Sequence, residues 1–63
     1  MNVSNYTYEE VKKEAQLLAA KVIREHVDNE IVTNNYKLGD KEWYALEKVK
    51  QRIVELANLG LLI

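Results

Sequence analysis

The 63-residue sequence contains no cysteine and no proline, and it has only two glycines, Gly39 and Gly60. Without cysteine the chain can form neither a disulfide nor a thiolate metal site. The single histidine, His26, cannot build a zinc site alone, because such a site needs several protein ligands. The two glycines lie 21 residues apart, which excludes a glycine-rich phosphate-binding loop. We therefore expect no metal and no cofactor.

The sequence also lacks an excess of either charge and any long apolar run. Nine basic and ten acidic residues give a net charge of −1. The sequence thus lacks the basic excess that drives general binding to nucleic acid phosphates. No apolar run approaches the roughly 20 residues that span a bilayer, and the N-terminus has neither the charge nor the apolar core of a signal peptide. We expect a soluble, cytoplasmic protein that does not bind membranes.

Catalytic groups are equally scarce. Ser4 lies at the terminus, Thr7 suits a helix cap, and His26 has no residue that could orient it as a base. His26 falls on the apolar side of its helix near the C-terminal end. A partly buried histidine is suited to that place, because its charge complements the negative end of the helix dipole. We therefore expect a protein that is not an enzyme and has no catalytic residue.

The clearest pattern lies in Asp40–Ile63, which holds the only tryptophan. Asp40 suits an N-cap whose carboxylate accepts from N–H groups of the first turn, and Gly60 suits the left-handed residue that ends a helix. This predicts a helix over residues 41–59 and a cap and tail over residues 60–63. Lys50 falls on the apolar side of this helix, where an ion pair with the preceding helix could hold it. At 100° per residue, the apolar side chains within about 80° of Leu46 are Trp43, Val49, Ile53, Val54, Leu56 and Ala57.

An earlier helix is predicted over residues 8–27, after a loose N-terminus of residues 1–6. Thr7 and Glu10 match the capping box, in which each side chain bonds the backbone N–H of the other residue. Tyr6 and Val11 occupy the positions of a hydrophobic staple that flanks the cap. Around Ala15, the side chains on the apolar side of this helix are Tyr8, Val11, Leu18, Ala19, Val22, Ile23 and His26.

The connection over residues 28–40 has two open interpretations. Its β-branched residues and the Asn34-Asn35 pair suit a short β-hairpin. Alternatively, Asp28 caps one or two helical turns that end at Asn34 or Asn35, and an extended Tyr36–Gly39 follows. We favour the helical interpretation, because an isolated two-stranded hairpin is marginal in water.

The predicted fold is therefore all-α: one small domain in which two antiparallel helices form a hairpin, with a structured connection that has room for a short third helix. A core of this size rarely supplies more than about 3–5 kcal/mol of stability. The two apolar stripes cannot cover each other fully, and they leave flanks partly exposed at Ile23, Val27, Val54 and Leu56. We expect a homodimer that completes a four-helix bundle.

The closing segment Val54–Ile63, VELANLGLLI, resembles the end of many winged-helix and helix-turn-helix modules, where a helix runs into Leu-Gly-Leu before a strand. The resemblance implies a DNA-binding regulator as the alternative function. Glu47 and Glu55 share the outward face of the helix, however, and would repel phosphates. The side chains that could reach base edges are Lys41, Lys48, Gln51 and Arg52.

Protein binding explains the composition with fewer assumptions. The chain is short and nearly neutral, and 48% of its residues are hydrophobic. Protein interfaces favour tyrosine and tryptophan as anchors, and Tyr44 points about 160° away from Leu46 on the helix. We predict docking to an acidic patch of a protein partner, because lysine and arginine give this face a modest positive charge. Small helical proteins of this size are common among accessory, regulatory and phage-encoded inhibitory proteins, and we expect a role of that kind. The predicted surface consists of Tyr36, Tyr44, Lys48, Gln51 and Arg52.

Overall fold

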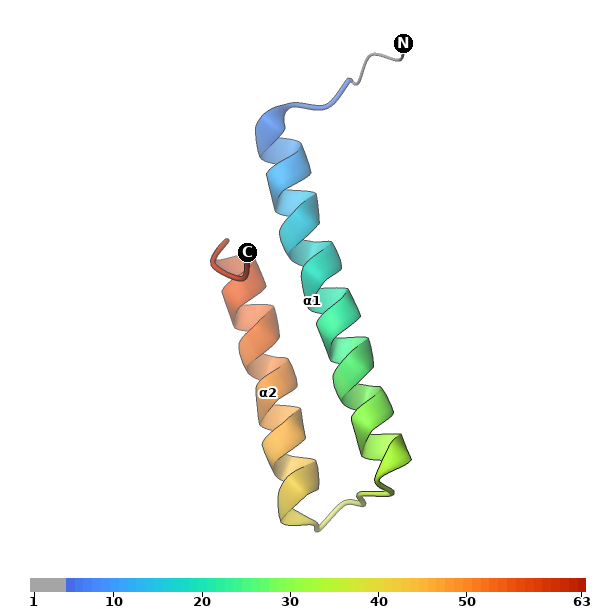
Figure 1. Cartoon of the computed structure of the whole chain (residues 1–63). Helices are drawn as coiled ribbons and strands as arrows, with labels where there is room; N and C mark the ends of the chain where they lie inside the picture. Colours follow the sequence, from blue (N-terminus) through green and yellow to red (C-terminus); the bar gives the residue numbers. More distant parts are fainter. Residues whose placement is uncertain (1–4) are drawn as a thin grey trace.

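The computed structural model describes residues 5–63 as two helices that form a hairpin (Figure 1). Helix α1 spans Tyr8–Thr33 and helix α2 spans Lys41–Asn58, and the two lie side by side and antiparallel. No strand occurs in residues 5–63, so the predicted all-α hairpin is confirmed and the β-hairpin interpretation of the connection is wrong. Residues 1–4 of the predicted loose N-terminus lie outside the described part of the chain.

Helix α1 begins where the capping box places it. The Thr7 hydroxyl oxygen accepts from the Glu10 N–H at 3.1 Å, and the Glu10 carboxylate accepts from the Thr7 N–H at 2.8 Å. Both N–H groups would otherwise lack a helical partner. The predicted staple residues Tyr6 and Val11 line one groove on the surface of α1. The start of α1 is thus confirmed in position and in its bonding.

The end of α1 lies six residues beyond the predicted boundary at residue 27. No glycine or proline intervenes, so the helix continues until the asparagine pair. Asn35 takes a φ of +59°, and the N–H groups of Asn35 and Tyr36 donate at 3.1 and 3.0 Å to carbonyls of the last turn. This is the Schellman arrangement, with asparagine in the left-handed position that glycine usually fills. The short third helix allowed by the sequence is therefore the final part of α1.

Helix α2 starts at the predicted cap, but the capping bond is different. Asp40 occupies the N-cap without a side-chain bond to the first turn. Its carboxylate instead accepts from the Lys37 N–H at 2.8 Å. The loop turns back at this point, because the Asp40 N–H donates to the Lys37 carbonyl at 2.9 Å and Gly39 takes a φ of +106°. The predicted position of Asp40 is confirmed, and its predicted bond is wrong.

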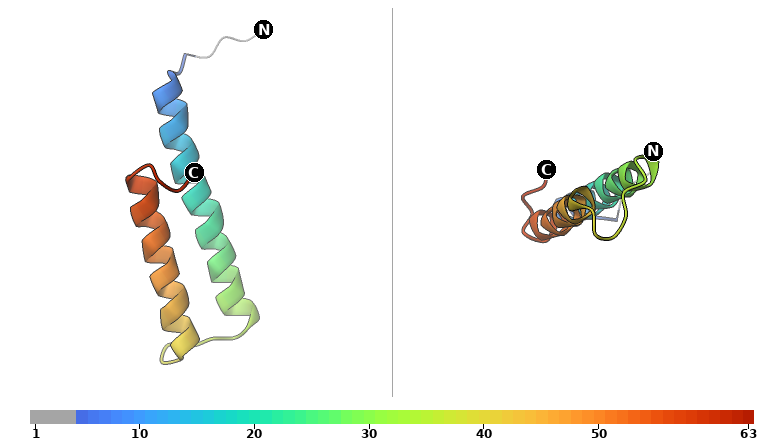
Figure 2. Two further views of the ribbon diagram at one scale, coloured as in Figure 1. Left: turned by 60° about the vertical axis from the view of Figure 1, so that its left-hand side comes forward. Right: turned by 90° about the horizontal axis from the view of Figure 1, so that it is seen from below.

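The end of α2 follows the prediction closely. Gly60 takes a φ of +74°, its N–H donates to the Ala57 carbonyl at 3.1 Å, and the Leu61 N–H donates to the Leu56 carbonyl at 2.8 Å. These two bonds again form a Schellman motif. The chain then turns toward α1, and the tail crosses the open end of the hairpin (Figure 2).

The helices meet along a narrow seam. Only Ala20, Val27 and Ala57 form its buried apolar part, together with the side chain of Gln16. No side chain in residues 5–63 is less than 2% exposed. Seen end on, the two helices form a single layer, and the Cα atoms extend 13 Å in the thinnest direction (Figure 2). The hairpin therefore encloses no conventional hydrophobic core.

The predicted apolar side of α1 is only partly the side that packs on α2. Ala19 and Ile23 are half-buried, but the other members of that group are exposed: Tyr8, Val11, Leu18, Val22 and His26. The expected partial burial of His26 is therefore wrong. Apolar residues lie on two opposite sides of α1, and a helical wheel centred on Ala15 merges them. The side chosen by α2 is the one that carries Gln16 and Ala20.

Candidate interaction surfaces

The first candidate surface is the side of α2 that faces away from α1, with Tyr44 at its centre. The Tyr44 side chain is 55% exposed. Its ring meets the half-buried Trp43 ring edge to face, with centroids 5.2 Å apart and planes at 85°. Such a contact restricts the tyrosine before any partner binds, so less conformational entropy is lost on binding. Tyr44 therefore has the exposure and the order of an interface anchor.

The predicted polar rim is only partly assembled around Tyr44. Lys48 and Arg52 follow it on the outward face of the helix and are exposed. Arg52 donates through Nη1 to the Glu55 carboxylate at 3.0 Å, with both side chains more than 60% exposed. An exposed pair of this kind is worth less than about 1 kcal/mol and is readily exchanged, yet it reduces the local positive charge. Gln51 lies at the border of this face, where it lines the groove between the two helices.

Tyr36 lies in the connection and not on α2. It is half-buried in the connection, and its backbone N–H is bonded to the end of α1. Within residues 5–63 the only ring-to-ring contact is that between Trp43 and Tyr44. Tyr36 and Tyr44 thus form no ring contact with each other, and a shared surface of the two tyrosines stays a prediction.

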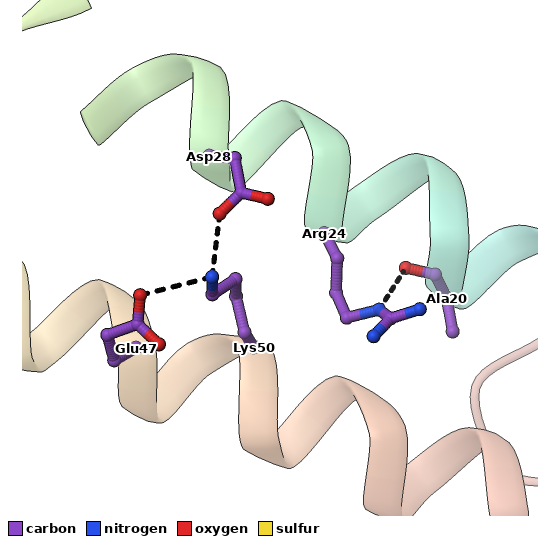
Figure 3. A network of polar contacts seen from close by, with 5 residues as sticks. All are labelled: Ala20, Arg24, Asp28, Glu47 and Lys50. Atoms are coloured by element: carbon purple, nitrogen blue, oxygen red, sulfur yellow. Dashed lines mark hydrogen bonds and ion pairs between the residues drawn. The ribbon is translucent and has the colours of Figure 1, made fainter. Parts of the chain in front are cut away.

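The groove between the helices contains an ion-pair network (Figure 3). Lys50 Nζ lies 2.6 Å from the Asp28 carboxylate of α1 and 3.0 Å from the Glu47 carboxylate of α2. The hydrogen bond to Asp28, followed by that to Glu47, raises the pKa of Lys50 above its ordinary value of 10.5. Arg24 does not join the network, since its Nε donates to the Ala20 carbonyl at 3.4 Å. The predicted pairing of Lys50 with the first helix is confirmed, and the network serves to hold the two helices together.

Gln16 is a buried polar residue that the sequence patterns did not single out. It is 4% exposed, and its side chain holds the C-terminal tail against α1. Its Oε1 accepts from the N–H groups of Leu62 and Ile63 at 2.9 and 3.3 Å. Its Nε2 donates to the carbonyls of Gly60 and Ile63, each at 3.3 Å. Two donors and two acceptor sites exhaust the capacity of a glutamine amide, so no polar atom of Gln16 is left unsatisfied.

The second candidate surface lies on the side of α1 opposite the seam. Val11, Leu18 and Val22 are 54%, 50% and 63% exposed there, with the half-buried Ala15 between them. Their spacing of four, three and four residues is that of the a and d positions of a heptad. We call Val11, Ala15, Leu18 and Val22 the second stripe. It begins where α1 extends past the end of α2, in a region that the partner helix does not cover (Figure 1).

The relation between the helices gives no support to the helix-turn-helix alternative. That motif crosses its helices at about 90–120° over a turn of about three or four residues. Here the helices are antiparallel and are joined by residues 34–40. The cationic side chains of α2 are also offset by Glu47 and Glu55, which pair with Lys50 and Arg52.

Other kinds of site find no support in the described residues. Residues 5–63 contain no group of three or more histidine, aspartate or glutamate side chains placed to hold a metal ion. Within the same range, neither helix combines the length and the apolar character that crossing a bilayer requires. No protein-family model matches the sequence, and comparisons with curated proteins and with solved structures find no similar chain. The two surfaces are therefore the features on which a functional argument can rest.

Proposed function

We propose that this chain is a small protein-interaction module without enzymatic activity, which docks through the outward face of α2 on an acidic patch of a larger protein. The observation that carries the proposal is Tyr44. Its large ring is 55% exposed on a helix face that the seam does not use, and Trp43 holds it in place. An accessory, regulatory or inhibitory role in the cytoplasm fits a module of this size.

The charges beside Tyr44 support the choice of an acidic partner. Among the described residues Lys48 forms no ion pair, and Arg52 is held only by the exposed Glu55. A carboxylate on the partner could bind Lys48 directly and could compete with Glu55 for Arg52. Rim charges of this kind mainly accelerate association, whereas a central aromatic anchor supplies about 2 kcal/mol or more.

Affinity capture with matched tyrosine variants tests the proposal. The wild-type chain, Tyr44→Ala and Tyr8→Ala would each be immobilised and exposed to lysate of the host. Tyr8 is 76% exposed on α1, so its replacement controls for the loss of an exposed tyrosine elsewhere. We expect a protein that the wild type and Tyr8→Ala retain, and that Tyr44→Ala binds about 30-fold more weakly.

A second pair of variants decides between the two helices. If Tyr44→Ala retains the partner like the wild type, while a change at Leu17, a 44% exposed leucine of α1, abolishes binding, the docking face is on α1 and the proposal is wrong. Circular dichroism of each variant, compared at equal concentration, would show whether lost binding reflects a lost fold. Tyr44 is 55% exposed and is not one of the buried seam residues, so its variant should keep the helical signal.

A further inference from the structure

The hairpin exposes more surface than a compact protein of its mass. A folded monomer of 7.3 kDa is expected to expose about 4,200 Å². This chain exposes 5225 Å². The area is that of all 63 residues, the N-terminal segment before α1 included, and it exceeds the compact value by about 1,000 Å². Each partner in a standard protein interface covers roughly 800 Å², so the chain has surface to spare for a second molecule.

The distribution of apolar residues identifies α1 as the helix that needs a second neighbour. Its seam side carries Ala20 and Val27, while its opposite side carries the exposed second stripe. The leucine, isoleucine and valine residues of α2, by contrast, lie on one side, which includes the buried Ala57. A helix that is apolar on opposite sides is typical of a position between two packed neighbours.

We propose that the second stripe packs antiparallel on the same stripe of a second copy of the chain, so that two α1 helices form the centre of a twofold symmetric dimer. In this arrangement Ala15 lies opposite the second copy's Leu18, and Val11 lies opposite the second copy's Val22. All four residues of the stripe are then covered by stripe residues of the second copy. Such an interface is self-complementary, as twofold symmetry requires.

The charges that flank the stripe select this register. Glu14 and Lys21 occupy equivalent heptad positions beside it, and neither forms an ion pair within the described chain. In the proposed register Glu14 of each copy lies beside Lys21 of the other, which creates two ion pairs. A shift of one heptad brings Lys21 beside Lys21 or Glu14 beside Glu14, and both arrangements repel. A parallel alignment would place Glu14 beside Ala19, which offers it no charge.

This pairing is independent of the proposed docking surface. The second stripe lies on the side of α1 away from α2, whereas Tyr44 and Lys48 lie on the side of α2 away from α1. A dimer can therefore present both α2 faces to other proteins. Loss of pairing and loss of partner binding should consequently respond to different variants, so either proposal can fail without the other.

The oligomeric state of the whole chain tests the proposal. Light scattering behind a sizing column would measure the mass from about 1 µM to about 500 µM, a range that covers ordinary dimer affinities. We expect the mass to rise from 7.3 kDa to twice that value. Leu18→Glu should raise the dissociation constant of the dimer about 100-fold or more, because it places two facing carboxylates in the apolar contact. Leu59→Glu, a change at a 67% exposed leucine outside the stripe, should leave the dimer intact.

Charge reversal tests the antiparallel register. Glu14→Lys and Lys21→Glu should each raise the dissociation constant about tenfold, since each places like charges together twice. The double variant E14K/K21E should return to the wild-type value, because its reversed charges again face their opposites. Circular dichroism would show that Leu18→Glu and the charge variants remain helical.

Several outcomes would overturn the proposal. One is a wild-type mass of 7.3 kDa at every concentration. A second is a dimer that remains intact in Leu18→Glu. A third is a dimer that Leu59→Glu disrupts as strongly as Leu18→Glu does. If the chain is monomeric alone but binds a different protein through Leu18, that protein and not a second copy covers the second stripe. If the dissociation constant of E14K/K21E does not return to the wild-type value, the antiparallel register is wrong.

Discussion

The amide of Gln16 fastens the C-terminal tail to α1 through four hydrogen bonds. Gln16→Ala should destabilise the chain by about 1–3 kcal/mol, because it removes these bonds from a partly buried site. Thermal unfolding would measure this loss, and hydrogen exchange should accelerate at the amides of Leu62 and Ile63. The other glutamine, Gln51, is exposed, and Gln51→Ala should change stability by less than about 0.5 kcal/mol. Unchanged exchange at Leu62 in Gln16→Ala would show that the tail is held by other contacts.

The raised pKa of Lys50 predicts a loss of stability at alkaline pH. Asp28 and then Glu47 favour the charged amine in the folded state, so the pKa lies above 10.5 when folded and near 10.5 when unfolded. The resulting stabilisation is fully present below pH 10.5 and declines as the pH rises through the folded pKa. Urea unfolding gives the free energy of unfolding of the wild type and of Lys50→Met, and the difference between the two isolates the contribution of Lys50. If this difference is constant from pH 9 to pH 12, the ion pairs of Lys50 do not contribute to stability as described.

Among the helices, α2 was predictable from sequence because its leucine, isoleucine and valine residues lie on one side and its end has a distinct signal at Gly60. The capping box likewise predicted the start of α1 at Thr7. The packed side of α1 was not predictable, since two apolar sides compete and only the position of α2 decides between them. The bonding of Asp40 depends on the path of the loop, which helical periodicity does not describe.

The candidate surfaces likewise combine features that helical periodicity predicts with features that it does not. The outward exposure of Tyr44 follows from the period of α2, and the sequence predicted it. Pairing of Arg52 with Glu55 reflects side-chain geometry, and the position of Tyr36 reflects the loop, so neither followed from periodicity. The role of Gln16 depends on where the tail crosses α1. The one signal available in the sequence was the position of Gln16, a polar residue that lies four residues before Ala20 and therefore on the same side of α1.

The seam is built around small side chains. Ala20 and Ala57 are 5% and 7% exposed, one on each helix. Ala20→Leu should destabilise the hairpin by about 1–3 kcal/mol, because the larger side chain must force the helices apart or adopt a strained rotamer. Ala45→Leu, at an exposed site on α2, is the matched control and should have an effect below about 0.5 kcal/mol. Urea unfolding compares them, and equal stability of the two variants would mean that the seam has spare volume.

The whole molecule is extended rather than compact. Its Cα radius of gyration is 15.3 Å, against about 11 Å for a compact domain of 63 residues. Small domains without disulfides or metals usually gain stability by association. The single layer of helices and the absence of fully buried side chains in residues 5–63 suit that route. Stability should then be a property of the assembly and should depend on protein concentration.

Thermal unfolding at several concentrations tests this dependence directly. Unfolding of a dimer releases two chains, so dilution favours the unfolded state by mass action. A hundredfold dilution of the wild type should lower the Tm by on the order of 10 °C, given the usual entropy of unfolding per residue. Leu18→Glu should remove this dependence and give the low Tm at every concentration, although Leu18 is half-exposed and lies outside the seam. A wild-type Tm that does not change with concentration would mean that the hairpin is stable as a single chain, since a monomer unfolds without any change in the number of molecules.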